Sequence, residues 1–308
     1  MLYRIDFEEL SMFFYIFIAL LAPFFDAITT IMECALSNKT FKRPTSMIFY
    51  ISIMDAVFVP LVFIFGMPSL PSSQCLLIYF ILGMFDLLYL YPYYTAMKVI
   101  DTSIVAALLS LGQIIITILS FIILNEVLTL HQYIGFAIIV MASIALSIKG
   151  GKIPKLSRAF WWMLFSSLAV SCRLILAKYT MVVDENWINT VVYPCIISGS
   201  IPFIFLLFPR MRKNIFNNFV SYKNKFKIFA LNEFLCFILM CCLIFGLSAL
   251  SPVASAGISA LQPIFVMMIC YFLSVLYNFT FKEKITIRTM LKKFFCFVLI
   301  ILGVILVV

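Results

Sequence analysis

Charged residues are scarce in this sequence. Only 11% of its 308 residues are Asp, Glu, Lys or Arg, whereas 65% are hydrophobic. Soluble domains carry roughly a quarter charged residues, because water has to solvate their surface. The composition therefore excludes a water-soluble globular protein and predicts an integral membrane protein.

Groups for metal or nucleophilic catalysis are scarce as well. The chain has one histidine, His131, and contains no HExxH motif, no GxSxG motif and no glycine-rich phosphate loop. Its nine cysteines show no paired metal-ligand spacing, so we interpret them as small buried hydrophobes and expect neither a metal nor a cofactor. Two alternatives stay open: an intramembrane aspartyl enzyme acting through Asp26 and Asp86, and a channel, although no filter-like loop repeats.

Apolar stretches recur along almost the whole chain. A helix of about 20 mainly apolar residues crosses the hydrocarbon core of a membrane. The windows between polar breaks predict ten spans, at Met12 to Met32, Ser46 to Phe65, Cys75 to Ala96, Ser103 to Leu124, His131 to Ile148, Phe160 to Met181, Trp187 to Phe208, Ile228 to Leu250, Val253 to Tyr277 and Met290 to Val308. Only short connections separate them, so the predicted fold class is an all-α integral membrane protein.

The two halves of the chain resemble each other weakly. AALLSLGQII from Ala106 is similar to AGISALQPIF from Ala256, and FFYIFIALLA from Phe13 is similar to FWWMLFSSLA from Phe160. We interpret this as an internal duplication into two five-helix repeats, residues 1–150 and 151–308. Because five is odd, the second repeat is expected to enter the membrane inverted relative to the first.

The positive charges lie in short gaps between the apolar stretches. The net charge is +9, but no basic face or stripe is present, which favours anionic lipid headgroups over nucleic acid as the partner. Lys and Arg are concentrated after spans one, five, seven and nine. If these connections are cytoplasmic, both termini lie outside.

One segment, DTSIVAALLSLGQIIITILSFIILNEVLTLHQYIGF, resembles the EamA-like family of the drug/metabolite transporter superfamily. The resemblance depends on an apolar fourth span followed by Leu124, Glu126, Leu128, Thr129, Gln132 and Gly135. A second copy keeps Ser251, Pro252, Pro263, Glu283, Ile285 and Thr286. The sequence departs from the family pattern at three positions, where Gln113 replaces a frequent proline and Asn125 and Lys292 replace glycines.

The resemblance implies a transporter of two inverted five-helix repeats around a cavity lined by spans one, three, four, six, eight and nine. It also implies termini in the cytoplasm, against the count of loop charges. We expect the protein in a bacterial inner membrane. Glu126 and Glu283 lie at span ends beside threonines, so we interpret both as structural caps of the next helix.

Several ionisable side chains fall inside the predicted spans, namely Asp26, Asp55, Asp86, Arg173 and Glu233. Each costs about 2.5 to 3.5 kcal/mol at a helix centre on insertion scales, so each needs a function or a partner. Aligning the first span of each repeat pairs Asp26 with Arg173, which predicts an ion pair beside the cavity. Asp55, on span two, is expected to be structural.

The third span carries a polar face. Helical spacing puts Asp86, Tyr89 and Tyr93 on one side, and Pro92 frees a backbone carbonyl one turn back. Aromatic rings beside a carboxylate suit an ammonium ligand, although tyrosines near a span end also serve as interface anchors. We expect Asp86 to recognise a cation or to carry a proton, and Asp86→Asn to remain folded because it removes an unpaired charge.

These observations predict a secondary transporter that moves a small polar metabolite, such as an amino acid, an amine or a drug-like compound, by alternating access with proton coupling. The expected partners are membrane lipid, the small-molecule substrate, a proton and, as a homodimer, a second copy of the chain, but not nucleic acid. The residues expected to bind substrate or couple protons are Asp26, Asp86, Tyr89, Tyr93, Gln113, Arg173, Asn232, Glu233 and Gln262.

Overall fold

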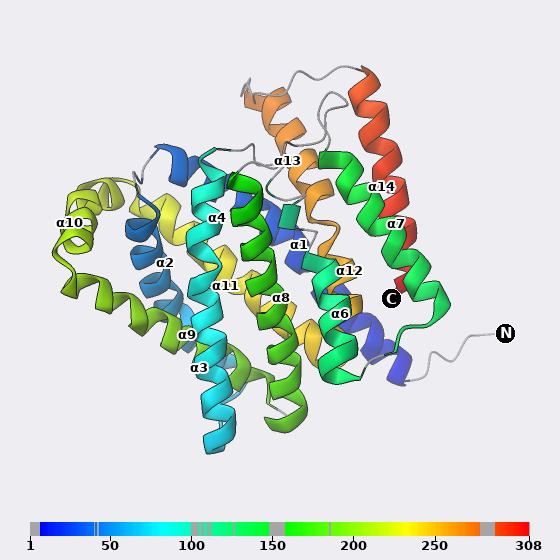
Figure 1. The fold of residues 1–308 in the computed structure, drawn as a ribbon, viewed down its shortest axis with the longest axis horizontal. Coiled ribbons are helices and arrows are strands. Elements are labelled where there is room, and N and C mark those ends of the chain that lie inside the picture. Colours follow the sequence, from blue (N-terminus) through cyan, green and yellow to red (C-terminus); the bar gives the residue numbers. More distant parts are fainter. Residues whose placement is uncertain are drawn as a thin grey trace.

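The computed structural model of the protein describes residues 7–39, 41, 43–99, 105, 108–109, 112–125, 127–147, 158–184, 186–277 and 287–307, and these contain helices but no strand. The helices, drawn in Figure 1, are α1 (Phe7–Lys39), α2 (Pro44–Phe58), η1 (Val59–Ile64), α3 (Ser73–Leu88), α4 (Leu90–Met97), α6 (Gly112–Leu124), α7 (Leu130–Ser147), α8 (Arg158–Asp184), α9 (Trp187–Ser200), η2 (Ile201–Leu207), α10 (Pro209–Asn224), α11 (Phe226–Ala249), α12 (Pro252–Ser259), α13 (Gln262–Tyr277) and α14 (Ile287–Val307).

Seven segments of the described chain are long and apolar enough to cross a membrane: Met12–Ser37, Pro44–Ile64, Ser73–Met97, Phe160–Asp184, Trp187–Leu207, Phe226–Ala249 and Pro252–Cys270. Each overlaps a predicted span. The other three predicted spans contain shorter apolar helices, Gly112–Leu124, Leu130–Ala142 and Val298–Val307. The all-helical membrane fold is therefore confirmed, and the full number of ten crossings stays a prediction.

Proline marks where several spans change geometry. The helices α2 and α9 each continue into a tighter 3₁₀ segment whose second residue is proline, Pro60 in η1 and Pro202 in η2. Proline has no N–H to donate and its ring crowds the preceding turn, so the regular α-helical bonding ends there. The third span is interrupted at Tyr89, three residues before Pro92.

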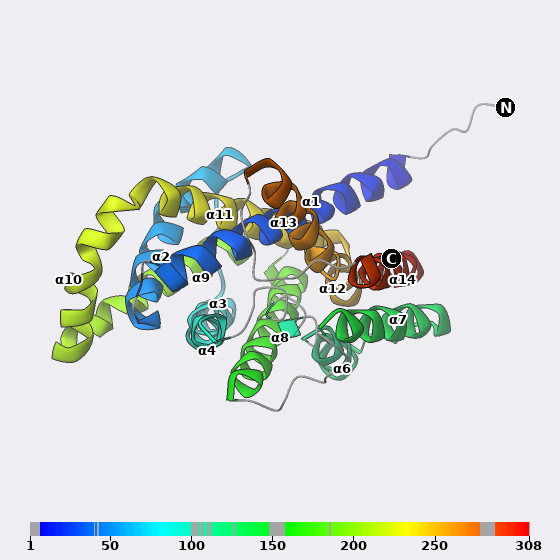
Figure 2. The same ribbon diagram turned by 90° about the horizontal axis from the view of Figure 1, so that it is seen from above.

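The helices of the two halves pack in an exchanged pattern. From the first half α1 contacts α11, and from the second half α8 contacts α3. The helices α2 and α9 pack together, as do α6 and α12, and α7 and α14. Figures 1 and 2 show α7 and α14 side by side at one side of the molecule, with α10 on the opposite side.

The basic segment after span seven was expected to be a loop, and this expectation is wrong. Residues Pro209–Asn224 form α10, which docks on α2. Tyr50 donates to the carbonyl oxygen of Ile215 at 2.8 Å, and its ring stacks on that of Tyr222 with centroids 4.3 Å apart. The apolar side of this helix repeats every three to four residues, a period that a count of its charges overlooks. The side of the membrane on which α10 lies stays a prediction.

The structure explains two positions of the family motif that follows span four. Asn125, at a position of the family's glycine, has a φ of 54°, a left-handed conformation that glycine and asparagine adopt most readily. The backbone N–H of Thr129 donates to Gln132 Oε1 at 2.9 Å, and that of Gln132 donates to Thr129 Oγ1 at 3.4 Å, a reciprocal cap at the start of α7. The expected caps from Glu126 and Glu283 lie outside the described residues.

Candidate functional site

A cavity of about 270 Å³ lies where the two halves meet. The expected spans one, three, four, six, eight and nine all contribute lining residues. Spans two and seven contribute as well, through Ser52 and Asp55 of α2 and Cys195 and Ser198 of α9. The lining is therefore wider than the family resemblance implied, and Asp55, expected to be structural, faces the cavity.

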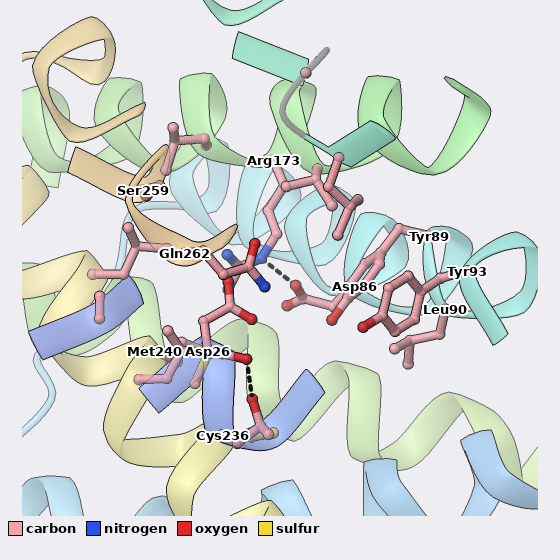
Figure 3. Close-up of a pocket in the computed structure, with 18 of the residues that line it drawn as sticks. Asp26, Asp86, Tyr89, Leu90, Tyr93, Arg173, Cys236, Met240, Ser259 and Gln262 are labelled. Atoms are coloured by element: carbon pink, nitrogen blue, oxygen red, sulfur yellow. Dashed lines mark hydrogen bonds and ion pairs between the residues drawn. The ribbon is translucent and has the colours of Figure 1, made fainter. Parts of the chain in front are cut away.

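Arg173 and Asp86 form an ion pair across the cavity, shown by a dashed line in Figure 3. Both side chains are largely buried, with exposed fractions of 12% and 15%. The pair joins α8 to α3, two helices that pack against each other. The membrane interior solvates neither charge, so each neutralises the other.

The predicted pairing of Arg173 with Asp26 is wrong. Asp26 instead accepts a hydrogen bond from Thr30 Oγ1 at 3.3 Å, and Gln262 Nε2 donates to Thr30 Oγ1 at 3.0 Å. Aligning the two halves of the sequence predicts equivalent positions along two helices but not the direction in which each side chain points. Because α8 packs on α3, the nearest carboxylate for Arg173 comes from α3.

Glu33 is a cavity residue that the sequence analysis missed. Tyr94 donates to Glu33 Oε1 at 2.8 Å, Tyr93 donates to Glu33 Oε2 at 3.1 Å, and Cys236 Sγ lies 4.0 Å from Oε1. The predicted first span ends at Met32, whereas the helix α1 continues to Lys39. Glu33 lies seven residues after Asp26, a spacing that returns a side chain to the same helix face. The sequence therefore did indicate that Glu33 shares a face with Asp26.

The predicted face of Asp86, Tyr89 and Tyr93 does line the cavity. Figure 3 shows the three side chains directed into the same space as Asp26 and Gln262. The tyrosines of this region thus divide by role: Tyr93 and Tyr94 bind Glu33, while Tyr91 is exposed and contacts Trp162 edge-on with centroids 6.0 Å apart. Of the three tyrosines near the end of this span, Tyr91, Tyr93 and Tyr94, Tyr91 alone faces outward, as an interface anchor does.

Two of the remaining predicted residues differ in position. Glu233 lines the cavity, whereas its neighbour Asn232 is fully buried and is not part of the lining. Asn232 Nδ2 donates to Glu233 Oε1 at 2.8 Å, so Asn232 orients Glu233. Gln113 and Gln262 both line the cavity as predicted.

The cavity has a surplus of acidic groups. Its described lining contains five carboxyl side chains, Asp26, Glu33, Asp55, Asp86 and Glu233, and one guanidinium, that of Arg173. Arg173 is paired with Asp86. Asp26, Glu33 and Glu233 each accept a hydrogen bond from an uncharged donor, and Asp55 has no hydrogen-bond partner among the described residues. Such a site attracts positive charge.

The geometry does not favour the aspartyl-enzyme alternative. An aspartyl pair needs two carboxyl groups in direct contact that share a proton. Here Asp86 contacts Arg173 and Asp26 contacts Thr30. Within the described part of the chain, no three His, Cys, Asp or Glu side chains gather in a way that could hold a metal ion.

Comparison with known proteins agrees with this architecture. Residues 13–148 match the EamA-like transporter family. The resemblance predicted from the sequence is thereby confirmed over almost all of the first predicted repeat, and the EamA-like match indicates a membrane transporter of the drug/metabolite type. No curated protein matches the chain significantly. A solved crystal structure is similar at 13% identity, with a TM-score of 0.65 over 96% of each chain, so the two share a fold.

Proposed function

We propose that the protein is a secondary transporter that binds a small molecule with a positively charged group in this cavity and moves it by alternating access. The observation that carries the proposal is the surplus of five carboxyl groups over one guanidinium among the described residues that line the cavity. The rings of Tyr89 and Tyr93 border the same space and supply faces to which a cation is attracted.

We infer two inverted repeats of five helices each, residues 1–150 and 151–308, that rock around the cavity. The exchanged packing supports this, because α1 on α11 and α8 on α3 are equivalent contacts under a two-fold relation. The paired segments α2–η1 and α9–η2, each with a proline at the change of geometry, support it too. The family match ends near the proposed boundary between the repeats.

A proton is the coupling ion in this proposal. An acidic cavity in a membrane needs neutralising charge whether or not substrate is present, and a proton can replace a departing cation. Asp55 is the favoured carrier, since its carboxylate accepts no hydrogen bond from the described residues. Asp55→Asn should then abolish the pH dependence of transport in reconstituted vesicles, while Asp184→Asn, outside the cavity, should leave it intact.

The charge preference can be tested with three ligands of one shape: phenethylamine, 2-phenylethanol and phenylacetate. A ligand that binds only the native state raises the unfolding temperature of purified protein. We expect phenethylamine alone to do so, and to be taken up by proteoliposomes. Stabilisation by phenylacetate or 2-phenylethanol equal to that by the amine would refute a cation site.

A further inference from the structure

Two buried oxygen atoms of the cavity have no hydrogen-bond partner among the described residues. They are Gln113 Oε1, on α6, and Ser52 Oγ, on α2. The side chains are 5% and 2% exposed, and both residues line the cavity. Buried polar atoms in folded proteins nearly always have a partner, so two unpaired oxygens on residues that line one cavity indicate that something else supplies the partner.

The cavity is poor in donors for these oxygens. Several donors that line it or stand behind it already serve carboxylates: Arg173 serves Asp86, Tyr93 and Tyr94 serve Glu33, and Asn232 serves Glu233. The amide nitrogen of Gln262, on α13, donates to Thr30. Gln113 Oε1 can only accept, and none of the described donors reaches it, so the group that pairs with it has to bring an N–H or O–H.

We propose that the ligand carries N–H donors on its charged group, as a primary ammonium or a guanidinium does, and that Gln113 Oε1 and Ser52 Oγ accept from them. This inference rests on the proposed function and narrows its substrate class. A quaternary ammonium has the same charge but no donor, and it leaves both oxygens unpaired and desolvated. Sites built to accept a hydrogen bond reject analogues that lack the donor.

The test compares phenethylamine with its N,N,N-trimethyl derivative, which keeps the ring, the linker and the charge. We expect the primary amine to bind wild-type protein about ten-fold or more tightly, measured by calorimetry on the purified protein. Equal affinities would overturn the inference and leave the cation site standing. Binding of neither compound would overturn both proposals.

Because the trimethyl group is also larger, a variant must separate hydrogen bonding from size. Gln113→Met keeps the length of the side chain and removes the acceptor. We expect the unfolding temperature of the ligand-free variant to be unchanged or higher, since an unpaired polar atom is lost, and the preference for the primary amine to fall several-fold. Gln132→Met, at a glutamine outside the cavity, should keep the full preference. A full preference in Gln113→Met would mean that Gln113 Oε1 does not accept from the ligand, against the inference.

Discussion

The cavity and the α7–α14 pair are built from the same apolar helices but are held together differently. In the cavity, an ion pair joins the two halves, and tyrosine hydroxyls donate hydrogen bonds to a carboxylate. Between α7 and α14 the backbones themselves approach: a Cβ built on Gly135 would lie 2.6 Å from the carbonyl oxygen of Gly303. Neither α7 nor α14 contributes a described residue to the cavity lining.

This difference separates stability from recognition. Small residues let membrane helices approach closely and pack by van der Waals contact. The cavity keeps ionisable groups that are costly in a membrane and leaves two oxygens unpaired. Variants in the α7–α14 pair should therefore change stability alone, and variants in the cavity should change stability and binding together.

The largest effect is expected at the ion pair. Arg173→Gln or Asp86→Asn alone strands a buried charge and should lower the free energy of unfolding by about 3–5 kcal/mol, whereas the double variant should recover most of that loss. Asp86 is not the unpaired charge that the sequence suggested, so Asp86→Asn alone is not expected to be well folded. Chemical unfolding in detergent measures the three values, and additive losses would contradict the pairing.

The Glu33 cluster should come next. Tyr94→Phe removes a 2.8 Å hydrogen bond to a buried carboxylate, at a cost of about 1.5–3 kcal/mol, and should also weaken phenethylamine binding, because it alters a carboxylate of the cavity. Tyr91→Phe is the control, since that ring faces outward. A similar loss of stability in both variants would show that the hydroxyl contact with Glu33 carries no special weight.

A change in the α7–α14 pair should affect stability without affecting binding. Gly135→Ala forces a methyl group against the Gly303 carbonyl and Leu306 Cβ, each 2.6 Å away, and overpacking of this kind costs about 1–3 kcal/mol. Ala137→Val, at an exposed position of the same helix, should be close to neutral. Calorimetry with phenethylamine on Gly135→Ala is the deciding measurement. A weakened affinity would show that the α7–α14 pair and the cavity are coupled.

The smallest effect is expected at the cap of α7. Thr129→Ala removes the side-chain acceptor for the Gln132 N–H and should cost about 1 kcal/mol, with phenethylamine affinity unchanged. Serine keeps a hydroxyl at this position, so Thr129→Ser should retain most of the stability. If alanine and serine behave alike in thermal unfolding, the cap contributes nothing measurable.

The sequence by itself determined where most helices lie. Runs such as Trp187–Leu207 exceed the thickness of the hydrocarbon core and carry almost no charge, so helix is the only conformation that satisfies their backbone in lipid. It also located Asp86, Tyr89 and Tyr93 on one face, because a helical period fixes neighbours along a single helix. It failed at α10, whose charges hid a helical period, and at Glu33, which lay one residue beyond the predicted end of the first span.

Only the tertiary structure decided which side chains from different helices meet. The sequence places Arg173 inside an apolar span, but its partner depends on the rotation of α8 against α3, which the local sequence does not encode. The same holds for the two tyrosines on Glu33 and for the unpaired oxygen of Gln113. Lipid and helix interior are equally apolar, so hydrophobicity sets the spans, while packing and the pairing of polar groups set how they turn toward one another.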